Sequence, residues 1–209
     1  MIQLALDRMN MDEAIEMART VESSIDWIEV GTSLIKEFGM NSVKQMSAHF
    51  PDKKIVADMK TIDNAAYEME LCFQNGADIA TVMGAASDVT IQACLEKARE
   101  YKKQIMIDLL NVSDTRLEQL QIYDQAIFCE HVSKDSQENG GQALIHMRQH
   151  AGSMRAAAGG ITLTSLPAMI ADRLDVLIIG SAITKAKQPA HAARRFKEAI
   201  NIKKDVNSL

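Results

Sequence analysis

Ionisable side chains follow several short apolar runs of this sequence, and one group has a distinctive spacing. Asp58, Lys60 and Asp63 form an Asp-x-Lys-x-x-Asp motif directly after the apolar run 55–57. On an extended strand, residues two apart point to the same face, so Asp58 and Lys60 should lie side by side. The carboxylate keeps the lysine protonated and holds it in place. The motif therefore predicts a fixed positive charge at the end of a strand.

Four more ionisable side chains lie at or near the ends of other apolar runs: Asp7, Glu29, Asp108 and His131. Such groups are costly to place beside a core unless they pair or bind a ligand. Each has an ordinary explanation when taken alone. An aspartate after a strand often caps a helix, Glu29 could pair with Lys60, and a single histidine is usually only hydrogen-bonded. Their joint occurrence at successive strand ends instead predicts an active site.

Two of these carboxylates also predict a metal site. Glu29 and Asp58 belong to neighbouring apolar runs, so they would face each other if the runs form adjacent strands. Oxygen ligands in a partly hydrated site suit Mg²⁺ better than a softer metal. We therefore expect Mg²⁺ as the cofactor, held by Glu29 and Asp58.

Glycines follow the seventh and eighth apolar runs, as Gly159-Gly160 and Gly180-Ser181. Glycine lets backbone N–H groups approach an anion, and barrels often bind phosphate after strands seven and eight. These four residues therefore predict a phosphate site. Plain tight turns are the alternative.

The elements that would position these residues alternate along the chain. Short runs rich in Ile and Val indicate strands, and segments with helical periodicity lie between them. Eight such units favour a closed, parallel (β/α)8 TIM barrel over an open doubly wound sheet, and all strand ends would then converge on one face. No linker divides the chain, so residues 1–209 should form a single α/β domain. The expected strands are 2–6, 27–30, 55–57, 79–83, 105–107, 126–129, 154–158 and 176–179, and the expected helices are 12–21, 34–48, 65–74, 90–101, 115–120, 143–150, 163–171 and 189–202.

Composition argues against several other classes of protein. The net charge is −5 and aromatic residues make up 4% of the chain, so no basic face or stacking surface for nucleic acid is expected. No stretch approaches the ~20 apolar residues of a membrane span, and the first residues do not resemble a signal peptide. We expect a cytoplasmic protein with free, buried thiols at Cys72, Cys94 and Cys129. The remaining histidines are assigned no role: His49, His146, His150 and His191.

With these residues in place, the chain resembles the orotidine monophosphate decarboxylase superfamily over nearly its whole length. Barrels of that superfamily carry the Asp-x-Lys-x-x-Asp motif. The other similar segments are 4–7, 28–32, 76–78, 81–84 and 158–161. The resemblance implies a lyase that acts on a phosphosugar through an enediolate.

The resemblance also implies roles for the candidate residues. Lys60 would place positive charge beside the developing oxyanions, and His131 would move a proton as general acid or base. Asp7 and Asp108 would orient hydroxyl groups or Lys60. Asp63 would reach the active site of the neighbouring subunit, which would make the protein an obligate homodimer.

Four positions separate two branches of the superfamily. Asp108, Ala158 and Ser181 resemble 3-hexulose-6-phosphate synthases, whereas 3-keto-L-gulonate-6-phosphate decarboxylases carry Glu, Thr and Arg there. Lys134 stands where the decarboxylases have Arg, and it either grips the substrate or is only solvated. The resemblance thus implies condensation of ribulose 5-phosphate with formaldehyde, and the decarboxylase reaction is the alternative. A non-catalytic phosphosugar-binding protein is a third possibility, although buried charge clusters without a ligand contribute little stability.

Overall fold

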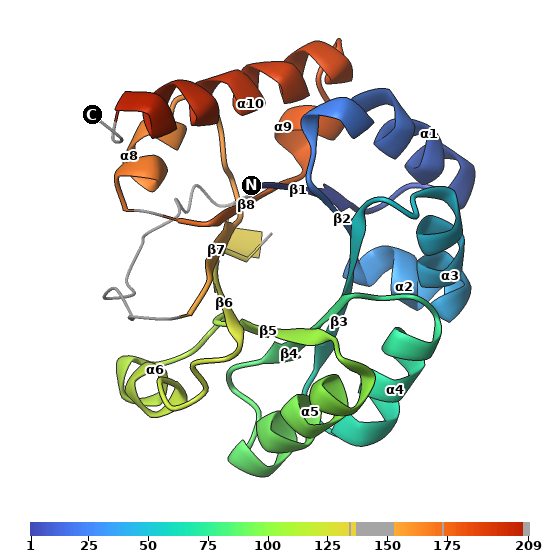
Figure 1. Cartoon of the computed structure of the whole chain (residues 1–209), viewed down its shortest axis with the longest axis vertical. Coiled ribbons are helices and arrows are strands. Elements are labelled where there is room, and N and C mark those ends of the chain that lie inside the picture. The colour runs from blue at the N-terminus through green and yellow to red at the C-terminus, as the bar shows by residue number, and fades with distance from the viewer. Residues whose placement is uncertain (134, 137–152, 173, 207–209) are drawn as a thin grey trace.

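The computed structural model is a closed barrel of eight parallel strands surrounded by helices (Figure 1). It describes residues 1–133, 135–136, 153–172 and 174–206. Each strand pairs with its neighbours in chain order, and β8 closes the barrel against β1. The predicted barrel is therefore confirmed and the open sheet is excluded. The strands are β1 Ile2–Leu6, β2 Trp27–Val30, β3 Lys54–Thr61, β4 Ile79–Met83, β5 Gln104–Asp108, β6 Ile127–His131, β7 Arg155–Ala158 and β8 Val176–Ile179.

The outer layer consists of helices close to the predicted ones. The helices are α1 Met11–Val21, α2 Thr32–Phe38, α3 Met40–His49, α4 Ala65–Gln74, α5 Asp88–Tyr101, α6 Asp114–Leu120, α8 Leu166–Ala171, α9 Ser181–Thr184 and α10 Pro189–Val206, with a 3-10 turn at Glu22–Ser24. Within the described ranges, no helix is long and apolar enough to cross a membrane.

One helix prediction was wrong in detail, and one helix was not predicted. The single helix expected at 34–48 is two helices, because the chain turns at Gly39 with a φ of 62° between α2 and α3. The short α9 was not expected at all. The helix predicted at 143–150 lies outside the described residues.

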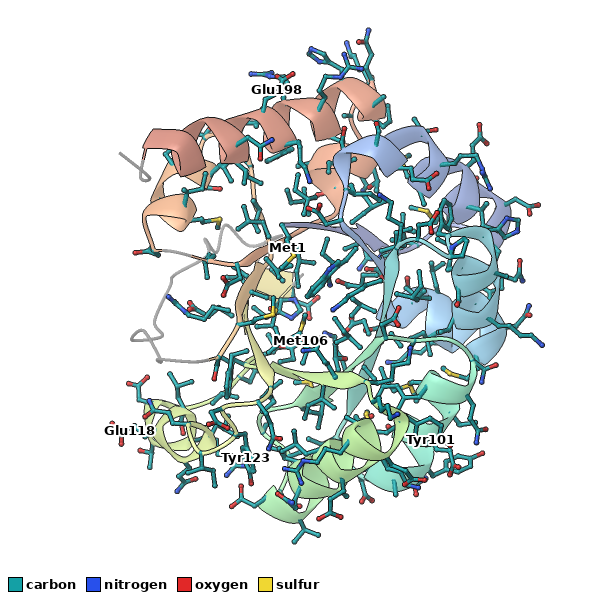
Figure 2. The ribbon with its side chains drawn as sticks, viewed as in Figure 1. Met1, Tyr101, Met106, Glu118, Tyr123 and Glu198 are labelled. Atoms are coloured by element: carbon teal, nitrogen blue, oxygen red, sulfur yellow. The ribbon has the colours of Figure 1, made fainter. Side chains whose placement is uncertain are left out.

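Side chains alternate along each strand between the barrel interior and the surrounding helices. The inward set forms a smaller apolar cluster, and the outward set packs against the helices in the larger one. Figure 2 shows the labelled Met106 inside the ring of strands, whereas Tyr101 and Glu198 lie outside it. The buried interior cluster consists of Trp27, Val56, Ile79, Met106, Ile127, Cys129, Ala156, Ala158, Val176 and Ile178. Its members on β7 are only alanines, so the interior wall is formed by small side chains on that side.

Aspartates before the strands hold the opposite end of the barrel together. The carboxylate before β2, β4 or β8 accepts a hydrogen bond from the backbone amide near the start of the preceding strand. These bonds are Ile2 N to Asp26, 2.7 Å, Ile55 N to Asp78, 2.9 Å, and Arg155 N to Asp175, 2.8 Å. Lys103 also donates to Asp78 over 2.6 Å. This end is therefore fixed by structural pairs, while different charged groups occupy the carboxyl ends of the strands.

The cysteines are free and buried, as predicted. Burial raises the pKa of Cys72 and of Cys94 to about 12. Both thiols therefore stay protonated at neutral pH and act as small apolar side chains.

Candidate active site

Asp58 and Lys60 of the Asp-x-Lys-x-x-Asp motif lie on a bulge of β3 and not on a regular strand. β3 continues to Thr61, beyond the predicted end at residue 57. Its register with β4 shifts between Ala57 and Thr61, and Lys60 adopts a left-handed φ of 53°. Asp58 and Lys60 do lie side by side, as predicted, but the simple alternation of a strand is not the reason. The bulge turns the lysine toward the carboxylate.

Lys60 is the centre of a hydrogen-bonded group of charges. Its ammonium donates to Asp58 Oδ1 over 3.1 Å and to Asp108 Oδ2 over 2.7 Å. Burial disfavours the charge, but Asp58 and Asp108 more than offset that cost and raise the pKa of Lys60 above its usual value. The ammonium is therefore permanently charged and held between two strands. The alternative of a Glu29–Lys60 pair is wrong, because Lys60 pairs with these two aspartates.

Asp108 joins Lys60 to His131. Oδ2 of this carboxylate lies 2.8 Å from His131 Nδ1, and Oδ1 accepts the amide of Leu110 over 2.9 Å. Burial works against the ionised form, yet the hydrogen bond and charge of His131, together with Lys60, lower the pKa of Asp108 to about 2. Asp108 is not a helix cap, because Ser113 caps α6.

The ionised Asp108 also fixes the proton of the His131 ring. A carboxylate without a proton can only accept a hydrogen bond, so Nδ1 of His131 must be the donor. The Nε2 atom is then left to exchange a proton with a ligand. The His131 side chain is 20% exposed, so it lies at the edge of the buried group. The residue predicted as general acid or base therefore has a defined orientation.

Acid should destabilise the protein through Asp108. Its folded pKa of about 2 lies below the value of about 3.9 for an unfolded aspartate. The ionised form therefore stabilises the folded state at neutral pH by roughly 2 to 3 kcal/mol, and this contribution is lost as the pH falls from about 4 to about 2. Urea unfolding at a series of pH values should show less acid dependence in Asp108→Asn than in the wild type. An identical acid profile would contradict the prediction.

Glu29 and Asp58 fit the predicted Mg²⁺ site by their chemistry. Both are buried, and burial followed by the charge of Asp58 raises the pKa of Glu29 well above its usual range. A divalent cation would relieve this repulsion. Among the described residues, no cluster of three or more His, Cys, Asp or Glu side chains is arranged around a metal site. Two carboxylates would therefore leave the other positions of Mg²⁺ to water and ligand oxygens, which is common for this ion.

Asp7 lies apart from the Lys60 group. Its Oδ1 accepts the amide of Ser33 over 3.2 Å and the hydroxyl of Ser33 over 2.7 Å, at the start of α2. Gly31 allows this approach, since a Cβ atom there would collide with the Asp7 carboxylate. Asp7 nevertheless adds to the negative potential that raises the pKa of Glu29. It therefore borders the carboxylate side of the site.

The two glycine turns lie next to each other at the ends of β7 and β8, which are paired. Gly159 and Gly160 have φ angles of 99° and 65°, which residues with a Cβ rarely adopt. Gly180 precedes α9, and Ser181 is its exposed first residue. A Cβ atom at Gly180 would meet only ordinary contacts with Ala5, so crowding does not explain that glycine. The four predicted residues thus lie at the ends of two paired strands, and one of them, Ser181, is exposed.

Asp63 is exposed in the loop after β3. No hydrogen bond or ion pair joins it to any residue within the described ranges. The nearby Ile62 and Tyr67 are exposed apolar side chains, at 55% and 58%. The structure therefore does not place Asp63 with Lys60 in the same chain. Lys134, the other open position, lies outside the described residues.

Besides Ser33, which binds Asp7, sequence reasoning missed three polar residues that contact the predicted carboxylates Glu29 and Asp58. Gln3 donates to Glu29 inside the barrel. Thr32 donates to Asp58 Oδ2 over 2.6 Å, and Thr81 donates to Asp58 Oδ1 over 3.0 Å. For Gln3 and Thr81 the available signal was a buried polar residue within an apolar run, since polar groups inside a barrel require a partner. Thr32 is partly buried at the start of α2 and had no such signal.

A cavity of about 410 Å³ lies near the glycine turns. Thr162 follows the β7 turn, Ala182 follows the β8 turn, and the first turns of α10 complete the wall. Lys187, His191 and Arg195 lie along that wall. His191, which was assigned no role, is therefore beside the predicted phosphate turns, although the cavity lining does not include the four predicted residues.

Comparison with known proteins identifies the family of this barrel. Residues 1–196 match the family described as "Orotidine 5'-phosphate decarboxylase / HUMPS". The chain belongs to this family. It is also 36% identical over 205 residues to a 3-hexulose-6-phosphate synthase of Bacillus subtilis (strain 168), covering 95% of this chain and 98% of the relative.

Solved structures of family members have the same fold. The chain matches the 3-hexulose-6-phosphate synthase of Salmonella typhimurium with a TM-score of 0.90 and 32% identity, over 96% of this chain and 98% of that one. It matches the 3-keto-L-gulonate-6-phosphate decarboxylase of Vibrio cholerae with a TM-score of 0.82 and 28% identity, over 97% of each chain. The resemblance inferred from the motifs is thus confirmed at the level of the family.

Proposed function

We propose that this chain, a carbon–carbon lyase, condenses ribulose 5-phosphate with formaldehyde to give 3-hexulose 6-phosphate and also catalyses the reverse reaction. The observation that carries the proposal is Asp108, which joins Lys60 to His131 and has the residue type of the synthase branch. Ala158 and Ser181 are also of the synthase type. The similarity to proteins named 3-hexulose-6-phosphate synthase over 95% of the chain supports the same activity.

The reaction begins with removal of a proton from the carbon beside the sugar carbonyl. His131 accepts this proton at Nε2, because Nδ1 is held by Asp108. The electron pair left on the sugar forms an enediolate, and the positive charge of Lys60 stabilises its oxygen. The enediolate then attacks the carbon of formaldehyde, so that a carbon–carbon bond forms. The formaldehyde oxygen becomes an alkoxide and takes up the proton that His131 accepted at Nε2, which returns the histidine to its starting state.

The remaining residues bind and orient the substrate. Glu29 and Asp58 would hold Mg²⁺, which supplies Lewis-acid neutralisation of negative charge when bound. Asp7 would accept a hydrogen bond from a sugar hydroxyl at the carboxylate side. The backbone amides of Gly159, Gly160 and Gly180, with the Ser181 hydroxyl, would hold the phosphate. The glycine turns follow β7 and β8, whereas Lys60 and Asp108 lie at the ends of β3 and β5. All four strand ends are at the same end of the barrel, so one extended phosphosugar would reach from the glycine turns to Lys60.

An assay against both branch substrates tests the proposal. Formaldehyde should be consumed only when ribulose 5-phosphate and Mg²⁺ are both present, and EDTA should abolish turnover until Mg²⁺ is restored. Release of CO₂ from 3-keto-L-gulonate 6-phosphate, without formaldehyde consumption, would assign the decarboxylase reaction. Calorimetric binding of phosphosugar with no turnover of either substrate would instead indicate a non-catalytic binding protein.

We further propose that the active enzyme is a homodimer with Asp63 shared between subunits. The exposed Asp63 has no partner among the described residues of its own chain, and it is flanked by exposed apolar side chains at Ile62 and Tyr67. Such side chains are suited to burial in an interface.

A further inference from the structure

Thr81 is the β4 residue that faces the β3 bulge. Ala57 pairs with Ala80, and Thr61 pairs with Val82. Three residues of β3, Asp58 to Lys60, are therefore opposite Thr81 alone. A bulge of this kind interrupts the backbone hydrogen bonds between strands, so the amides within it need other acceptors.

The Thr81 hydroxyl supplies one of those acceptors. It accepts the backbone amide of Lys60 over 2.8 Å and donates to Asp58 Oδ1 over 3.0 Å. The directions are fixed, since an amide can only donate and an ionised carboxylate can only accept. Thr81 is 3% exposed, so water does not readily replace it. One hydroxyl thus links the backbone of the lysine to the carboxylate that holds its ammonium.

This link maintains an unfavourable conformation of Lys60. A φ of 53° is costly for a residue with a Cβ, and it persists only where the surroundings hold it. Thr32 also binds Asp58, but its hydroxyl contacts the carbonyl and Oδ2 of that residue and not the backbone of Lys60. Thr81 is therefore the residue whose hydroxyl joins the backbone of Lys60 to the carboxylate that holds its ammonium.

We propose that Thr81 is a positioning residue for Lys60, which rests on the proposed function of Lys60 in stabilising the enediolate. Without the hydroxyl, Asp58 and Asp108 still bind the ammonium, so its charge is kept. The lysine backbone, however, loses its anchor, and the ammonium shifts relative to the reacting oxygen. Misplacement of a catalytic group lowers turnover more than it lowers substrate binding, because the phosphate is bound on other strands.

The test compares Thr81→Val, Thr81→Ser and Thr61→Val. Valine has the shape of threonine without the hydroxyl, and serine keeps the hydroxyl. Thr61 is the matched control, since it is similarly buried and its hydroxyl binds Glu68 on α4. We expect Thr81→Val to lower kcat by about 10- to 100-fold with KM within about threefold, and Thr81→Ser to keep kcat within about threefold. Thr61→Val should reduce thermal stability while kcat stays within about twofold.

Three results would overturn the inference: wild-type kcat in Thr81→Val, an equal loss of kcat in Thr61→Val, or no rescue by serine. If the valine variant does not fold, hydrogen exchange of the Lys60 amide in the wild type decides. A protected amide supports the anchor, and exchange as fast as in an exposed loop contradicts it. Failure of the proposed function is a separate result, because the wild type would then turn over neither branch substrate.

Discussion

Replacing Lys60 with alanine should remove nearly all turnover while leaving the barrel folded. The ammonium is the positive charge held between Asp58 and Asp108, and no other lysine or arginine of the described ranges joins this hydrogen-bonded group. Losing a preorganised charge beside a developing oxyanion should lower kcat by roughly 1000-fold. The fold should survive because Asp58 keeps its bonds to Thr32 and Thr81. Steady-state kinetics and circular dichroism of the variant measure both expectations.

Lys103→Ala is the matched control for this experiment. Lys103 forms a partly buried pair with Asp78 over 2.6 Å, but at the amino-terminal end of the strands. It should retain kcat within about twofold, since it is remote from the carboxyl ends where the site lies. Full turnover in Lys60→Ala would exclude the proposed site. An equal loss in both variants would indicate that general destabilisation, and not the lost charge, lowers the rate.

The strands were predictable from the sequence because each is a short apolar run next to a turn. The runs 2–6, 27–30, 79–83 and 176–179 match the observed strands at both ends. The predicted bounds of β5, β6 and β7 are off by one or two residues, and β3 differs most from its prediction. The carboxyl end of β3 is polar, because Asp58 and Lys60 bind each other and polar groups of β4, β5 and α2. The prediction followed the apolar residues and therefore ended at residue 57.

The partners within the site were less predictable than its members. Sequence spacing brought Asp58 and Lys60 together, and strand order brought Asp108 and His131 to the same end. The choice of Asp108 over Glu29 as partner of Lys60 depends on the bulge, which only the register of β3 against β4 defines. The same bulge gives Thr81 its two contacts. Thr81 contacts the backbone amide of Lys60 and not its side chain. Such a contact produces no characteristic residue spacing, so the sequence alone could not predict it.

Mixing two inactive variants should restore activity if Asp63 is shared between subunits. Lys60→Ala and Asp63→Ala would each remove a residue from every active site of their own dimers. In a mixed dimer, one site receives the intact Lys60 of one chain and the intact Asp63 of the other. Random reassociation should therefore restore about a quarter of wild-type turnover, since about half of the dimers are mixed and each has one complete site. Formaldehyde consumption before and after co-refolding of the two variants measures this.

The control pairs Lys60→Ala with Asp108→Asn. Lys60 and Asp108 bind each other over 2.7 Å within one chain, so no mixed dimer of these variants contains a complete site. This mixture should stay inactive under the conditions that restore the first one. Restoration in both mixtures would mean that refolding itself recovers activity. No restoration in the first mixture, despite dimers detected by light scattering, would place the function of Asp63 within its own chain, and the exposed loop around Ile62 and Tyr67 would then need another explanation.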